Sequence, residues 1–171
     1  MSEKSEKAGE AKKLKRLEAL KEELWGEELK ELPLWNRKRH VGFTTVPRTL
    51  PYICRILDEL SGKKGQPLSQ VYLALWFRSF DNELLELKDK DSLAYESGFS
   101  GERAITTWLS RMRQLKELGF ISAKPGTSGE FHNVLILNPL AVIKKIYEEK
   151  QHDERYNSLA SRMSEVKATW E

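Results

Sequence analysis

The chain has 171 residues, of which 39% are hydrophobic and 32% charged, a length that fits one domain with helical extensions. Its 29 basic and 26 acidic residues leave a net charge of only +3, so a surface for an anionic partner must come from local arrangement rather than from bulk charge. The single cysteine excludes an internal disulfide, and no apolar run approaches the ~18 residues that cross a membrane, so we expect a cytoplasmic protein without membrane contact.

The first 48 residues predict a tail, a helix and a basic connector. Residues 1–11 have almost no apolar side chains and are expected to be disordered. A helix is predicted over 12–32 from apolar residues at three- and four-residue steps, and Pro33 ends it. The stripe consists of Leu14, Leu17, Leu20, Leu24 and Trp25. The connector, residues 33–48, contains the densest basic run of the chain, Arg37-Lys38-Arg39-His40, which would either follow a nucleic-acid backbone or serve as a solvated linker.

Residues 49–88 are expected to supply the core. A helix is predicted over 49–60, with Pro51 in its first turn, where a missing N–H costs little. Cys54 lies in its apolar pattern and is interpreted as a buried small hydrophobe. The next helix, 67–80, is apolar on most of its circumference and is therefore a core helix. Residues 83–88 alternate in polarity and predict a short strand that joins a later hairpin.

Residues 92–138 form the most informative stretch. A short helix over 92–97 is followed by the turn Gly98-Phe99-Ser100 and a long helix over 101–118, for which Ser100 is the expected N-cap. Gly119 fits a left-handed C-cap. Strands are expected at 120–124 and 134–137, around the glycine-rich loop 125–129.

The long helix has two distinct faces when residues are placed 100° apart. The apolar face carries Ala104, Ile105, Trp108, Leu109, Met112 and Leu115. Arg111 lies at its boundary and is a candidate for packing. The polar face carries Arg103, Thr106, Thr107, Ser110, Arg113, Gln114 and Glu117, and its hydroxyls and arginines are groups that bond phosphates and base edges.

The ending Leu115-Lys116-Glu117-Leu118-Gly119-Phe120-Ile121 resembles the end of the recognition helix in winged helix-turn-helix proteins. The resemblance covers residues 49–138, with flanking segments 12–48 and 139–171 as helical extensions. The chain looks like a small winged-helix protein of bacterial or mobile-element origin, similar in style to plasmid replication initiators and transcription regulators. The resemblance implies a mainly α protein with a small antiparallel β-sheet.

The resemblance also implies double-stranded DNA binding in transcriptional or replication control, with the long helix in the major groove and a β-wing, residues 120–137, beside it. The contacts it implies are Ser100, Arg103, Thr106, Thr107, Ser110 and Arg113 from the helix and Lys124, Thr127 and Ser128 from the wing. Arg37, Lys38 and Arg39 would add an arm along the backbone. The alternative is a protein-interaction adaptor built on the same fold, without DNA binding.

The C-terminal extension is predicted to hold helices over 140–150 and 153–170. The second has apolar residues at alternating three- and four-residue steps, as in a coiled coil. These residues are Tyr156, Leu159, Met163, Val166 and Trp170. Such a stripe must pack on something, which is either a second copy in a homodimer or this chain's own domain, such as the Leu14–Trp25 stripe.

No residue pattern points to catalysis. His40, His132 and His152 are scattered without metal-ligand spacing, and no glycine-rich phosphate loop occurs. We therefore expect neither an enzyme nor a metal or cofactor site.

Overall fold

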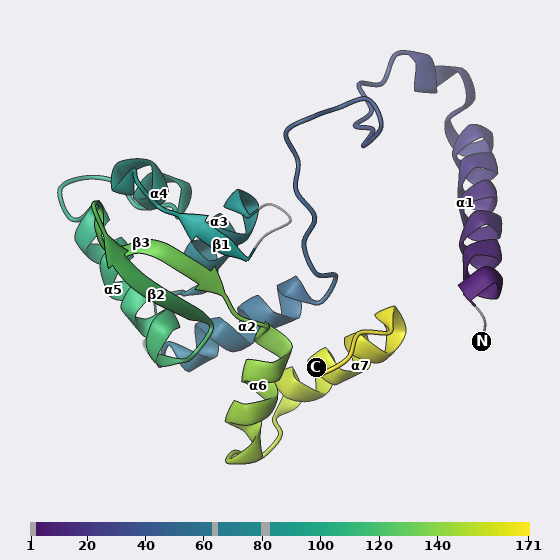
Figure 1. The fold of residues 1–171 in the computed structure, drawn as a ribbon. Coiled ribbons are helices and arrows are strands. Elements are labelled where there is room, and N and C mark those ends of the chain that lie inside the picture. The colour runs from purple at the N-terminus through teal and green to yellow at the C-terminus, as the bar shows by residue number, and fades with distance from the viewer. Residues whose placement is uncertain (1–2, 63–64, 80–82) are drawn as a thin grey trace. The chain divides into compact units, whose positions relative to one another are not determined.

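The computed structural model describes residues 3–62, 65–79 and 83–171 (Figure 1). The chain divides into a unit that ends at Gly42 and a second unit, Phe43–Glu171. Over the described residues it is a mainly α protein with one three-stranded antiparallel sheet, which confirms this part of the predicted fold class. None of the described helices has both the length and the apolarity that a membrane crossing requires.

The first unit is a long helix, α1 (Glu3–Trp25), followed by a 3-10 turn, η1 (Gly26–Lys30). The helix begins at Glu3, so the expectation of disorder over residues 1–11 is wrong for the part that the structure describes. The Lys, Glu and Ala residues there are good helix formers, which favours extension of the helix toward the N-terminus. The five side chains of the predicted stripe, from Leu14 to Trp25, are between 41% and 61% exposed.

The second unit contains every buried hydrophobic side chain of the described residues, between Leu50 and Met163. It opens with α2 (Leu50–Leu60), which has proline in its first turn as expected, and α3 (Ser69–Arg78). Asp58 links the two helices, because its carboxylate accepts the backbone N–H groups of Leu68 and Ser69 at 2.9 and 2.8 Å. A side chain of α2 thus satisfies the first turn of α3, which has no cap of its own.

The sheet has the strand order β1-β3-β2. The predicted strand β1 (Leu84–Glu86) pairs with β3 (Gly129–Ile136), which also pairs with β2 (Ile121–Gly126). The return strand starts five residues before the predicted Val134, because Phe131 turns inward and is 1% exposed. In Figure 1 the helices α4 (Lys90–Glu96) and α5 (Ala104–Glu117) lie beside this sheet.

The two C-terminal helices, α6 (Pro139–Glu148) and α7 (Glu154–Val166), complete the second unit. Helix α7 contacts α2, and Leu159 and Met163 are buried in the common core. Tyr156 stacks on Trp170, with ring centroids 5.2 Å apart. Within its own unit, α7 therefore packs on α2 through Leu159 and Met163, the central members of its stripe.

Candidate nucleic-acid interface

Helix α4 is held at both of its ends. Asp89 caps its start by accepting the backbone N–H of Ser92 at 3.0 Å, and the hydrogen bonds from Ser92 hold the pKa of Asp89 below its ordinary value. At its end the Phe99 N–H donates to the Ala94 carbonyl at 2.9 Å, and Gly98 adopts a φ of +81°. That glycine ends α4 and turns the chain toward α5.

Helix α4 is also tied to the core helix α3. Arg78 donates two hydrogen bonds to the Glu96 carboxylate, at 2.6 and 2.7 Å. This paired geometry lowers the pKa of Glu96 and keeps the carboxylate charged. Arg78 is therefore committed within the protein rather than offered to a ligand.

Helix α5 begins three residues later than its sequence suggested. Gly101 has a φ of +80°, which interrupts helical geometry, and residue Arg103 occupies the N-cap position without a side-chain bond. The expectation that Ser100 caps this helix is therefore wrong. The end agrees with expectation, since Gly119 has a φ of +82° and the Phe120 N–H donates to the Leu115 carbonyl at 2.9 Å.

The inward face of α5 is apolar as predicted. Trp108, Met112 and Leu115 are all 1% exposed or less. Arg111 is also buried, at 7% exposed, and desolvation lowers its pKa. Its Nε has no hydrogen-bond partner among the described residues. The interpretation of Arg111 as a packing residue is confirmed.

The outward face of α5 remains accessible. Arg103, Thr106, Ser110 and Arg113 are exposed, Thr107 is half-buried, and Ser100 is exposed in the turn that precedes the helix. Most of the polar groups that sequence reasoning selected on this segment therefore face solvent along one helix.

Arg113 is an exception because it already has a partner. Its Nε and its guanidinium NH2 group both lie 3.0 Å from the Glu130 carboxylate on β3. The pair links the middle of α5 to the wing. It also offsets the charge that Arg113 would bring to a phosphate.

The wing, residues 126–129 with the adjoining strand ends, turns through Thr127 and Ser128. The backbone N–H of Ser128 donates to Nδ1 of His132 at 3.3 Å, and His132 is 8% exposed. A Cβ added to Gly126 would come within 2.5 Å of the His132 ring, so only glycine fits there. The histidine supports the turn from within, whereas Lys124 and Thr127 are exposed and Ser128 is half-buried.

A shallow hollow of about 530 Å³ joins the wing tip to the two helices. It is lined by Ile105 at the start of α5, by Thr127 to Gly129, and by residues 88–91 before and in α4. The Lys90 ammonium lies 3.0 Å from the position of a Cβ on Gly129. Sequence reasoning missed Lys88 and Lys90, since only the sheet topology brings them to the wing.

The basic residues Arg37, Lys38 and Arg39 lie in the first unit and are exposed. They form a compact turn, because the Asn36 side chain accepts the Lys38 N–H at 2.8 Å and the Asn36 carbonyl accepts the His40 N–H at 3.0 Å. Trp35 stacks on His40, with ring centroids 6.0 Å apart. The three residues that the sequence suggested as an arm along the DNA backbone thus lie in a turn.

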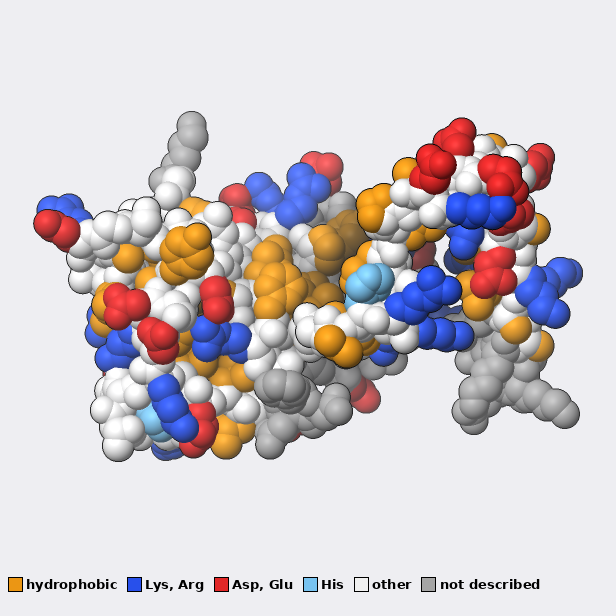
Figure 2. Space-filling view, turned by 90° about the horizontal axis from the view of Figure 1, so that it is seen from above, with side chains coloured by type: hydrophobic (Ala, Val, Ile, Leu, Met, Phe, Trp, Pro, Cys, Tyr) orange, Lys and Arg blue, Asp and Glu red, His pale blue; other side chains and the backbone are white. Residues whose placement is uncertain are grey.

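Acidic side chains lie among the basic ones. Glu102 and Glu117 flank α5 and are exposed, and Figure 2 shows acidic and basic groups interspersed on the face it presents. Among the described residues no cluster of His, Cys, Asp and Glu has the arrangement of a metal site. Cys54 is buried, and burial with the nearby Asp58 raises its pKa to about 12, so it is a protonated thiol at neutral pH.

Comparison of the chain with protein-family models, with curated proteins and with solved structures finds no match.

Proposed function

We propose that the second unit is a winged helix-turn-helix that binds double-stranded DNA, with α5 as the recognition helix and residues 126–129 as the wing. The order α3-β1-α4-α5-β2-β3 and the strand order β1-β3-β2 support this fold. The observation that carries the function is the exposed row Arg103, Thr106 and Ser110 along α5. A protruding helix with such groups fits the major groove of a duplex.

The proposal assigns different roles to the helix and to the wing. Arg103 lies at the first turn of α5, where recognition helices meet base edges, and an arginine can donate two bonds to a guanine. Lys124 lies on the exposed sheet face near the wing and would meet phosphates, which are the same in every sequence. Ser100, Thr107, Thr127 and Ser128 would add hydrogen bonds to the backbone.

The test is selection from a random duplex library followed by titration of the enriched duplex and of an unrelated one. We expect Arg103→Ala to lower affinity for the enriched duplex by about tenfold or more while leaving the unrelated duplex nearly unaffected. Lys124→Ala should weaken both duplexes alike. Lys144→Ala on α6 serves as a matched control. Failure to enrich any duplex, or equal effects of the three changes, would refute the assignment.

A second candidate function, protein docking on the sheet, is favoured by one observation. Leu84 and Leu135 are cross-strand partners on the outer face, at 45% and 42% exposed, and Leu137 follows at 37%. Apolar pairs on an exposed sheet face are typical of docking surfaces. Leu135→Ser should abolish capture of a protein partner under this function and leave DNA affinity unchanged under the first.

A further inference from the structure

A cavity of about 400 Å³ lies beside the end of α3, where β3 leads into α6. All of its described lining residues belong to the second unit, and none of them lies on α5 or in the wing. Small-molecule sites in proteins have volumes of roughly 300 to 1,000 Å³ and mainly apolar walls. This cavity has both properties, because Pro47, Ile136, Pro139 and Leu140 contribute most of its depth and are buried or half-buried.

Hydrogen bonds hold the walls of the cavity in place. The Ile136 N–H donates to the Glu83 carbonyl at 3.1 Å, which joins the end of β3 to the residue before β1. At the end of α3, the Ser79 carbonyl accepts the hydroxyl of Thr44 at 3.1 Å. Because the backbone on these sides is already bonded within the protein, a ligand would meet a preformed site.

The polar groups of the cavity are few and carry one sign of charge. Glu83 is exposed and is the only charged residue in the described lining, which has no lysine or arginine. Trp76 also lines the cavity, and indole is the side-chain ring that attracts cations most strongly. Thr49 is 1% exposed and occupies the N-cap position of α2 without a side-chain bond to that helix. Its hydroxyl oxygen is therefore a further acceptor for an N–H group.

We propose that this cavity binds a small organic amine with an apolar body. The body packs against Ile136 and Leu140, and the ammonium group lies toward Glu83, on the exposed side of the cavity. A carboxylate or phosphate ligand would instead meet a like charge there, which is unfavourable. An uncharged ligand of the same shape gains only the apolar contacts and binds more weakly than the amine.

The first test uses three probes with the same apolar body, which are naphthylmethylamine, naphthylmethanol and naphthoate. Each is titrated into the isotopically labelled full chain, and the indole N–H signal of Trp76 is followed by NMR and assigned by its loss in Trp76→Phe. We expect a saturable shift of this signal, with the amine binding most tightly and naphthoate most weakly. The signal of Trp108, which is buried outside the cavity lining, should stay in place. Equal affinities of the amine and the alcohol, or no shift with any probe, would overturn the proposal.

The second test locates the charge and the apolar wall with two matched pairs of variants. Glu83→Gln should lower the affinity for the amine by about two- to fivefold and leave the alcohol unaffected. Its control is Glu86→Gln, which removes an exposed carboxylate outside the described lining. Leu137→Ser should weaken both probes, whereas Leu135→Ser, at a similarly exposed position outside the lining, should not.

Circular dichroism verifies that each variant has kept its fold. Amine affinities that are the same in all four variants would mean that the probe binds elsewhere on the surface, and would overturn the proposal. Both tests use the protein without nucleic acid, so their outcome is independent of DNA binding, which the library selection and the Arg103 variant decide.

Discussion

The Glu130 carboxylate reduces the positive charge of the surface that we propose for DNA. Its Oε2 atom lies 3.0 Å from the guanidinium nitrogens of Arg113. Because the two residues are 17 positions apart, the sequence did not predict this ion pair. Both side chains are about half exposed, so the pair adds little to stability. Its main consequence is electrostatic, because it removes one cation from the face that we assign to DNA.

Replacing Glu130 by Gln should therefore strengthen binding to every duplex. Arg113, released from its partner, can contact a phosphate. The slope of log affinity against log salt concentration should then steepen by about one unit, as expected for one added phosphate contact. Titrations at several salt concentrations measure this. Glu165→Gln is the matched control, since Glu165 pairs with Arg162 at 2.9 Å on α7. Identical salt slopes for the two variants would argue against Arg113 facing the duplex.

The contact between Gly126 and His132 makes a second prediction at the residue scale. A Cβ at position 126 meets three atoms of His132 within 2.9 Å, so Gly126→Ala should lower the free energy of unfolding by about 1–3 kcal/mol. Chemical denaturation measures the loss. The same change in a His132→Ala background should cost less, because the ring atoms Cγ and Cδ2 are gone and only the Cβ of residue 132, at 2.9 Å, still opposes the new side chain. An equal loss in both backgrounds would mean that the wing relaxes without help from the histidine.

Sequence periodicity predicted which α5 residues face inward, since burial follows the 3.6-residue repeat. Arg103, Thr106 and Ser110 were found in this way, and Arg111 was correctly set apart. What periodicity could not predict was the partner of each polar group. Arg113 meets Glu130 because α5 lies beside β3, Lys90 meets the wing because β1 pairs with β3, and His132 meets Gly126 and Ser128 through the bend of the β2-β3 hairpin. Helical periodicity encodes none of these contacts.

At the scale of elements, helix starts were the least predictable feature. The Ser100 cap was expected from residue type alone, yet Gly101 takes a left-handed conformation and delays α5 to Ala104. Asp89, Asn138 and Asp153 cap α4, α6 and α7 with their side chains, as their residue types allow. Core helices and strands were recovered because their apolar patterns are long or strongly alternating.

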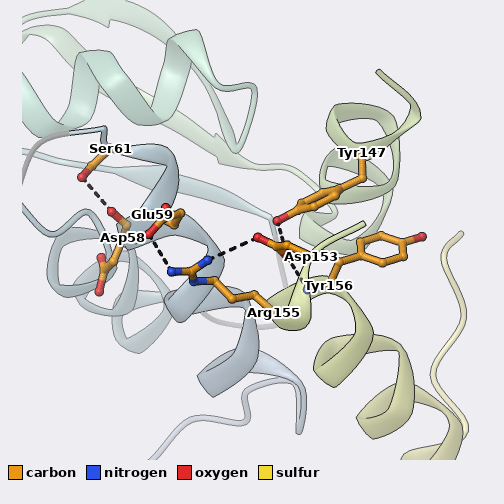
Figure 3. A network of polar contacts seen from close by, with 7 residues as sticks. All are labelled: Asp58, Glu59, Ser61, Tyr147, Asp153, Arg155 and Tyr156. Atoms are coloured by element: carbon orange, nitrogen blue, oxygen red, sulfur yellow. Dashed lines mark hydrogen bonds and ion pairs between the residues drawn. The ribbon is translucent and has the colours of Figure 1, made fainter. Parts of the chain in front are cut away.

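Helix α7 depends on a polar network around its cap (Figure 3). Asp153 accepts the Tyr156 N–H at 2.9 Å and the Tyr147 hydroxyl at 3.1 Å, and Arg155 bridges it to Glu59 on α2. Burial alone would raise the pKa of Asp153, but these hydrogen bonds and Arg155 hold it below its ordinary value of 3.8. Burial and the bond to Asp153 raise the pKa of Tyr147 to about 12.

The Asp153 network predicts a dependence of stability on pH. Because the folded state lowers the pKa of Asp153, its contribution is present above pH 3.8 and is lost as the pH falls through the lower folded value. Asp153→Asn keeps a capping side chain but not the charge. Its free energy of unfolding should therefore be lower than that of the wild type at neutral pH and equal to it in acid. Asp153→Ala also loses the cap, which should lower the free energy of unfolding by about 1 kcal/mol both at neutral pH and in acid. Chemical denaturation at neutral pH and in acid tests this. A stability deficit of the Asp153→Asn variant that persists in acid contradicts it.

The burial of the α7 stripe makes a separate prediction. Leu159→Ala should lower the free energy of unfolding by about 2–5 kcal/mol, as expected for a fully buried leucine. If Leu159 packs within its own chain, the loss is the same at every protein concentration. Val166→Ala, at a half-buried position of the same helix, should cost far less. Denaturant midpoints that shift with concentration would instead point to a dimer through α7.

At the scale of the whole molecule, the two units differ in how much of their apolar surface is buried. All buried hydrophobic side chains of the described residues lie in the second unit, together with α5 and the wing. The first unit contributes an exposed apolar helix and the basic turn at residues 37–39.

Removal of residues 1–42 should therefore separate stability from affinity. The remaining chain, Phe43–Glu171, keeps every core contact described above, so its thermal unfolding midpoint should equal that of the full protein at low concentration. Its affinity for the enriched duplex should fall under the proposed function, because the basic turn at residues 37–39 is lost. Calorimetry and duplex titration on the full and the shortened protein test both expectations, and a lower midpoint for the shortened chain would show that the first unit supports the core.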